Sequence, residues 1–138
     1  MKKCINIAFV YAVAALCMGV FYREFTKILG FTGRTTLAFG HAHLFGLGTL
    51  LFLILAVFCK MTNLEEQKQY KKFMIFYNIG LPFMVVMFIV RGVLQVLGTE
   101  LTRGADASVS GIAGIAHIII TVGIVFMFLA LKKTAEKA

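Results

Sequence analysis

Two histidines one residue apart, His41 and His43, stand in the stretch GHAHLFG near the start of a long apolar run. A third histidine, His117, lies in another apolar run, and Arg91 lies in a third. Ionisable side chains within apolar segments are costly, and they mark ligand, ion or proton sites. Neutral imidazoles are ligands for the iron of haem, for copper and for zinc. These four residues are therefore the first candidates for chemistry.

The composition identifies the class of protein that holds them. The chain has 138 residues, of which 60% are hydrophobic and 14% are charged, and its mean hydropathy is +0.91. A soluble domain of this length needs more polar surface to cover its core. We therefore expect one integral membrane domain over residues 1–138. The net charge of +8 comes from short basic clusters between apolar runs, which suit a lipid bilayer with anionic headgroups and do not suit nucleic acid.

Four apolar segments are long enough to cross a bilayer, because a spanning helix needs about 20 residues. They cover about 4–22, 36–59, 73–98 and 108–131. The connections between them are short. The sequence therefore predicts an all-α fold, an integral membrane four-helix bundle with up-down topology.

The distribution of Lys and Arg predicts the orientation of this bundle. If the N-terminus is inside, nine basic residues fall in inner segments: Lys2, Lys3, Lys60, Lys68, Lys71, Lys72, Lys132, Lys133 and Lys137. Four fall in outer loops: Arg23, Lys27, Arg34 and Arg103. Basic residues are enriched in cytoplasmic loops, so both termini are expected in the cytoplasm.

The candidate residues share one depth in this arrangement. At about 1.5 Å per residue, His41 and His43 lie about 8–11 Å below the outer end of their span, His117 about 12–14 Å and Arg91 about 10 Å. Gln95 lies one turn from Arg91 on the same face. Residues two apart in a helix point about 200° apart, so His41 and His43 cannot share a face. This geometry predicts an oligomer or two separate sites.

Haem binding explains both the histidines and the arginines at this depth, whereas a bare metal ion explains only the histidines. No carboxylate lies deep in any of the four predicted spans, which argues against a hard-cation site. Haem propionates need cations near the membrane surface, and Arg91, Arg103 and Arg34 are placed to supply them. Because the chain has no CxxCH motif, the haem would be noncovalent haem b. Copper or zinc is the alternative.

The predicted haem site combines ligands and lining residues from three spans. The axial ligands are expected among His41, His43 and His117, and the other cofactor-binding residues are Arg91, Gln95 and Arg103. Two ligand pairs stay open, His41 with His43 of a neighbouring chain and His43 with His117 within one chain.

Small residues in the spans are expected to serve packing. Glycines let helix backbones approach closely, and this role is expected for Gly40, Gly46, Gly48, Gly111 and Gly114, which would also leave room for a flat ligand. The three cysteines have no metal-ligand spacing and are expected to be small apolar fillers; they are Cys4, Cys17 and Cys59.

Three stretches resemble a family of small four-span bacterial membrane proteins that is known only as a domain of unknown function. They read FYREFTKILGFTGRTTLAFGHAHLFGLGTLLFLI, FYNIGLPFMVVMFIVRGVLQVLGT and ASVSGIAGIAHIIITVGIVFMFLALKK. The likeness covers almost the whole chain, and its specific parts surround His41 and His43, Arg91 and His117. It implies the four-span fold in the bacterial cytoplasmic membrane and implies no activity.

The HAH motif is also similar to one four-helix unit of the catalytic subunit of haem–copper oxidases. That subunit resembles three such units around a pseudo-threefold axis, and a His-x-His pair on the second helix of a unit serves two metal centres. The resemblance implies a homotrimer, which restores three units, and a role near the haem propionates for Arg91 or Arg103. This chain lacks an adjacent His-His pair for copper, so enzymatic activity is left open.

Three functions follow from these observations. The leading hypothesis is a haem b membrane protein for electron transfer, redox or gas sensing, or haem handling, with an unidentified redox partner. The first alternative is an oligomeric transporter or channel subunit, with the His/Arg layer as a polar pathway and a helix broken at Asn78 and Pro82. The second alternative is a structural partner of a membrane complex, in which the histidines make interhelical hydrogen bonds.

Overall fold

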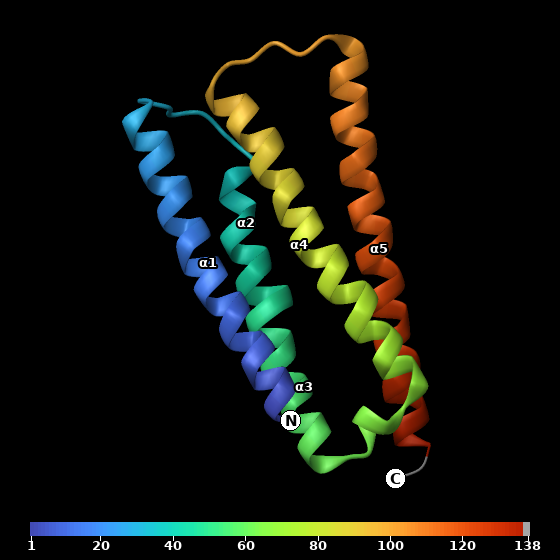
Figure 1. Ribbon diagram of the computed structural model, residues 1–138. Helices are drawn as coiled ribbons and strands as arrows, with labels where there is room; N and C mark the ends of the chain where they lie inside the picture. Colours follow the sequence, from blue (N-terminus) through green and yellow to red (C-terminus); the bar gives the residue numbers. More distant parts are fainter. Residues whose placement is uncertain (137–138) are drawn as a thin grey trace.

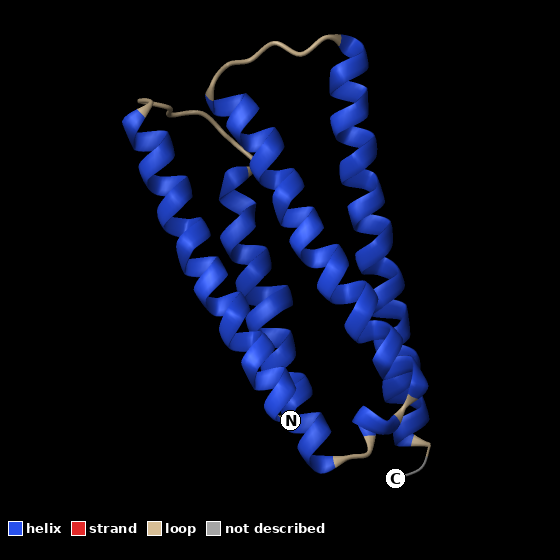
Figure 2. Cartoon of the chain, viewed as in Figure 1, coloured by secondary structure: helices blue, strands red, loops and turns tan. Residues whose placement is uncertain are grey.

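The computed structural model describes residues 1–136, which form helices and short connections without any strand. The elements are α1 (Lys2–Ile28), α2 (Leu37–His43), the π-helix η1 (Leu44–Leu50), α3 (Leu51–Met61), the short 3-10 helix η2 (Leu64–Glu66), α4 (Lys68–Val96) and α5 (Arg103–Ala135). Segments α2, η1 and α3 form one continuous second span (Figure 1, Figure 2). The predicted all-α, up-down fold is confirmed. Lys137, counted above among the inner lysines, lies outside the described residues.

Four helices are long and apolar enough to cross a membrane: 2–28, 37–61, 68–96 and 103–135. Each extends beyond the segment predicted from hydropathy at one end or both, because polar residues continue the helix past its apolar part. The second span begins one residue later than predicted and the third ends two residues earlier. Helix α4 begins at Lys68 instead of about 73, and α5, which carries His117, begins at Arg103 instead of about 108. The hydroxyl of Thr102 caps α5 by accepting a hydrogen bond from the Ala105 N–H over 3.3 Å.

Helices α1 and α4 end in the same way, at the end of the bundle away from the N-terminus (Figure 1). Gly30 and Gly98 follow them with φ of 59° and 62°, which a side chain disfavours. The Phe31 N–H donates to the Thr26 carbonyl and the Thr99 N–H donates to the Leu94 carbonyl, the bonds of a Schellman motif. Local backbone chemistry thus sets the turns that follow α1 and α4.

The helices pack as two pairs, α1 with the second span and α4 with α5 (Figure 1). Glycines make both pairs close. A Cβ added at Gly80 of α4 would lie 2.6 Å from the Ile120 backbone nitrogen of α5. A Cβ at Gly48 would lie 2.6 Å from the Tyr11 ring of α1, and one at Gly40 would lie 2.8 Å from Met18. The packing role predicted for Gly40 and Gly48 is confirmed.

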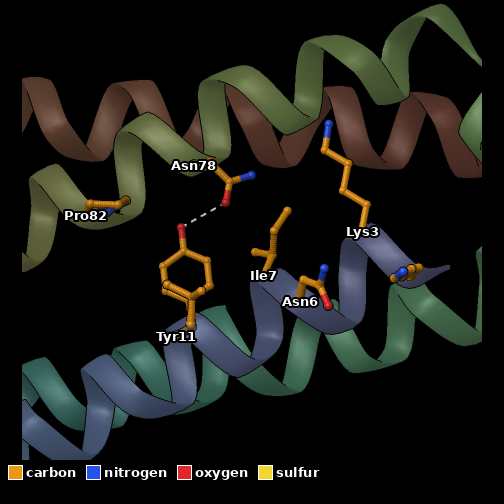
Figure 3. A pocket seen from close by; sticks show the side chains of 8 residues that line it. Lys3, Asn6, Ile7, Tyr11, Asn78 and Pro82 are labelled. Atoms are coloured by element: carbon orange, nitrogen blue, oxygen red, sulfur yellow. Dashed lines mark hydrogen bonds between the residues drawn. The ribbon is translucent and has the colours of Figure 1, made fainter.

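A groove separates α1 from α4 along part of their length. Two hollows of about 550 Å³ and 590 Å³ open there, and Tyr11 and Pro82 line both. The Tyr11 hydroxyl crosses the groove and donates to Asn78 Oδ1 over 3.0 Å (Figure 3). Neither hollow is lined by a histidine. Helix α4 continues through Pro82, so the expected break in this helix is not present.

Candidate functional site

The start of α2 is tied to α4 by threonine side chains. The hydroxyls of Thr35 and Thr36 donate to the Gly92 and Phe88 carbonyls over 3.0 and 2.9 Å. The Thr36 N–H donates to Gln95 Oε1 over 2.8 Å. An N–H in the first turn of a helix has no partner within the helix, so Gln95 supplies one from a neighbouring helix. Gln95 thereby positions the helix that carries the histidine pair.

His43 and His117 are brought together around one aromatic ring. The ring centroid of Phe88 lies 4.9 Å from that of His43 and 6.3 Å from that of His117, and both contacts are edge-on. Helices α2, α4 and α5 each contribute one of these rings. The two imidazoles therefore lie at one level of the bundle, as their predicted depths indicated.

The hydrogen bonds of these two imidazoles fix their tautomer. His43 Nδ1 lies 2.8 Å from the Phe39 carbonyl oxygen, and His117 Nδ1 lies 2.9 Å from the Ala113 carbonyl oxygen. A carbonyl oxygen only accepts, so Nδ1 must carry the proton in both rings. In the neutral ring, the lone pair is then on Nε2. This arrangement is typical of a histidine prepared to bind a metal through Nε2.

His41 lies on another side of α2, as the 200° separation predicts. Its Cβ would lie 3.8 Å from a Cβ added at Gly19 of α1, so the side chain packs beside that helix. Its Nδ1 is buried and has no hydrogen-bond partner within residues 1–136. The three histidines therefore do not converge on one point. Among residues 1–136, no histidine belongs to a cluster of three metal-ligand side chains.

Arg91 contacts the first turns of α5. Its Nη1 donates to Asp106 Oδ1 over 2.9 Å and its Nη2 donates to Ser110 Oγ over 2.5 Å. Asp106 was not expected beside Arg91, because α5 begins before the predicted span and carries this carboxylate in its first turn. The side chains are 30% and 54% exposed, so the pair contributes at most about 1 kcal/mol to stability. Its main effect is to hold the guanidinium in place.

The two arginines predicted for the site lie at different heights. Ser110, which Arg91 contacts, precedes His117 by about two turns, or about 10 Å along α5. Arg103 precedes His117 by about four turns, or about 21 Å. Arg103 is exposed and has no ion-pair partner in the described part of the chain. The structure therefore brings Arg91, and not Arg103, toward the level of His117.

The surroundings of His43 and His117 are open. Nothing lies within 4 Å of a Cβ added at Gly46, Gly111 or Gly114, so the packing role expected for these three glycines was wrong within this chain. Gly46 lies one turn from His43, and Gly114 lies one turn from His117. His117 itself is exposed. We call the surface formed by His43, Phe88, His117, Gly46 and Gly114 the histidine face.

A second cluster of metal-ligand side chains lies elsewhere. The sulfurs of Cys4 and Cys59 and a carboxylate oxygen of Glu65 all lie within 4.8 Å of one another. The two cysteines do pack as apolar residues, as expected, since Cys4 lies in the hydrophobic core and Cys59 packs against it, but their proximity to Glu65 was not expected. Cys17 is exposed and stands apart from the cluster. Spacing motifs are local, and 55 residues separate this pair. The available signal was that Cys4 lies at the start of the first span and Cys59 at the end of the second, so the up-down topology places both at the same end of the bundle.

The chain belongs to the family described as Protein of unknown function (DUF2871), whose model matches residues 1–134. No curated protein and no solved structure matches the chain. The family match confirms the resemblance to a family of unknown function, and the four apolar helices fit a small four-span membrane protein. The likeness to a haem–copper oxidase unit stays an analogy based on the HAH motif.

Proposed function

We propose that this DUF2871 protein binds haem b through His43 and His117 and serves in electron transfer within the membrane. The observation that carries the proposal is the pair of imidazoles from α2 and α5 that share Phe88 and bear their Nε2 lone pairs. Bound haem would supply one-electron redox chemistry. A bis-histidine haem has no open iron position, which favours electron transfer over gas binding.

The donor set of the histidine face fits haem better than bare copper or zinc. Two neutral imidazoles would supply the two protein ligands of the iron. Arg91 contacts Ser110, which precedes His117 by about two turns of α5, and from there its guanidinium can bind a propionate. A bare cation would be repelled by that guanidinium and would lack a third protein ligand there within residues 1–136. Arg103 is about four turns away and His41 packs beside α1, so neither belongs to the proposed site.

The residues of the face have distinct roles in this proposal. The Phe39 and Ala113 carbonyls orient the imidazoles, and Phe88 supplies an apolar contact to the edge of each ring. Gly46 and Gly114 leave space for a flat ring beside each ligand. Gln95 holds the start of α2 in place.

The proposal includes a homo-oligomer in the bacterial cytoplasmic membrane. An exposed imidazole such as His117 is unfavourable against lipid, so a second copy of the chain would cover the histidine face. The expected oligomer is a trimer, by analogy with the three four-helix units of the oxidase subunit.

Absorption spectroscopy tests the proposal. The protein would be expressed with added haem precursor, purified in detergent, and measured in the oxidised and reduced states. We expect a Soret band that shifts on reduction and one haem per chain by pyridine haemochrome assay. The proposal is rejected if purified protein shows no Soret band under this supply, or if it binds stoichiometric copper or zinc that is lost in the double variant His43→Ala/His117→Ala.

Arg91 and Asp106 provide a matched pair of variants for the propionate contact. Arg91→Leu removes a charge-assisted hydrogen bond, commonly about 1.5–3 kcal/mol, and should weaken haem binding at least about tenfold in a titration. Asp106→Asn frees the guanidinium from its carboxylate partner and should bind haem at least as tightly as the wild type. Equal affinities for wild type and Arg91→Leu would remove Arg91 from the site.

A further inference from the structure

The end of the bundle that holds the N-terminus brings together four elements that are distant in sequence (Figure 1). Cys4 lies in the first turn of α1, Cys59 near the end of α3, Glu65 in η2 and Tyr70 in the first turn of α4. The two sulfurs lie 4.0 Å apart. Cys4 is fully buried, Cys59 is half-buried, and the Glu65 side chain is 47% exposed. Buried sulfurs and an accessible carboxylate thus face one point.

We propose that Cys4, Cys59 and Glu65 form a binding site for a thiophilic divalent cation, with zinc as the best match. Tetrahedral zinc with Zn–S bonds of about 2.3 Å separates its sulfur ligands by about 3.8 Å. The observed distance of 4.0 Å needs little adjustment. Zinc also accepts carboxylate oxygen as a ligand, whereas calcium and magnesium would not select thiolates.

Tyr70 is placed to orient the two sulfurs. Its hydroxyl oxygen lies 2.9 Å from Cys4 Sγ and accepts a hydrogen bond from the Cys59 thiol over 3.6 Å. On metal binding both thiols would release their protons, and the Tyr70 hydroxyl would then donate to a thiolate. Such outer hydrogen bonds typically change metal affinity about 10–100-fold. Tyr70 is therefore a positioning residue for the site.

The local charge is suited to an anionic metal complex. Two thiolates, one carboxylate and Zn²⁺ sum to a charge of −1. The ammonium group of Met1 pairs with Glu65, and Lys3 lines the same groove as Glu65 and Tyr70.

The bound ion would join α1 to α3 and to the connection before α4. Contacts among these elements otherwise depend on apolar packing, the Tyr70 hydrogen bonds and the ion pair between the Met1 ammonium group and Glu65. The site is formed by no residue of the histidine face, so it is independent of the haem proposal. The two proposed sites also use different ligands, because this one has two thiolates and a carboxylate and the histidine face has imidazoles.

Zinc itself is the probe for the experiment. Reduced, chelator-treated protein in detergent would be titrated with Zn²⁺, and Co²⁺ would report thiolate ligation through its charge-transfer absorption. We expect one ion per chain in the wild type and in the control Cys17→Ala, which keeps both ligand cysteines. Cys4→Ala and Cys59→Ala should each weaken binding more than tenfold, and Tyr70→Phe should weaken it about 10–100-fold.

Glu65→Gln keeps the test valid if a cysteine variant fails to fold. Glu65 is exposed and belongs to a short connection, so its replacement should leave the bundle folded while it weakens zinc binding. Circular dichroism and size-exclusion chromatography check the fold of each variant. The proposal is overturned if reduced wild type binds no zinc, or if Cys4→Ala/Cys59→Ala binds zinc as tightly as wild type.

Discussion

His43→Ala and His117→Ala should each abolish the reduced-state spectrum of a bis-histidine haem, while His41→Ala should keep it. If haem binds as proposed, each of the first two variants would remove one of its two protein ligands, whereas His41 packs beside Gly19 of α1, away from the proposed site. With one ligand lost, the haem would be held weakly. We expect haem content to fall at least about tenfold after purification, measured by pyridine haemochrome per mole of chain.

Thermal unfolding of the haem-free proteins separates this effect from misfolding. His117 is exposed, so His117→Ala should unfold at a temperature close to that of wild type. His41→Ala removes a buried histidine whose Nδ1 has no partner in the described chain, so it controls for the loss of a buried imidazole outside the proposed site. Retention of full haem by the double variant His43→Ala/His117→Ala would contradict the assignment, as would selective loss in His41→Ala.

Hydropathy was sufficient to predict the four helices, because a bilayer requires continuous apolar segments of fixed length. It did not predict where the helices end. Those ends depend on local caps such as the Thr102 hydroxyl and the positive-φ glycines Gly30 and Gly98. Asp106 was consequently assigned to a loop, and its pairing with Arg91 was missed.

The common depth of His43 and His117 followed from counting residues, whereas their environment did not. Depth depends on the rise of a helix, which is nearly constant. The direction in which each ring points depends on how the helices rotate against each other, and that is decided by contacts distant in sequence. The contacts of Phe88 with both imidazoles and of Gly19 with His41 are of this kind.

The sequence also did not predict the π-helical segment η1, which directly follows His43. Seven residues, Leu44–Leu50, adopt it. Tertiary contacts accompany it, since the Tyr77 hydroxyl donates to the Leu47 carbonyl over 2.9 Å and Gly48 lies against the Tyr11 ring. Short π-helical segments are frequent at functional sites, so its position beside a candidate ligand agrees with the proposed site.

Gly80→Ala should separate α4 from α5 and lower the stability of the bundle more than any exposed glycine substitution. The added Cβ would lie 2.6 Å from the Ile120 backbone nitrogen, and a backbone atom cannot move aside as a side chain can. Overpacking of this kind commonly costs about 1–3 kcal/mol. Thermal unfolding in detergent, followed by circular dichroism, should show a clearly lower midpoint.

Gly111→Ala is the matched control for this substitution. It makes the same chemical change within α5, but nothing lies within 4 Å of the added Cβ. Both variants gain the same intrinsic helix propensity, about 1 kcal/mol in water, so the difference between them isolates the packing cost. Equal midpoints for the two variants would show that α4 and α5 do not approach at Gly80. A different result, in which Gly111→Ala is the less stable variant, would indicate that the open surface at Gly111 is covered. Another copy of the chain in the proposed oligomer would cover it in that way.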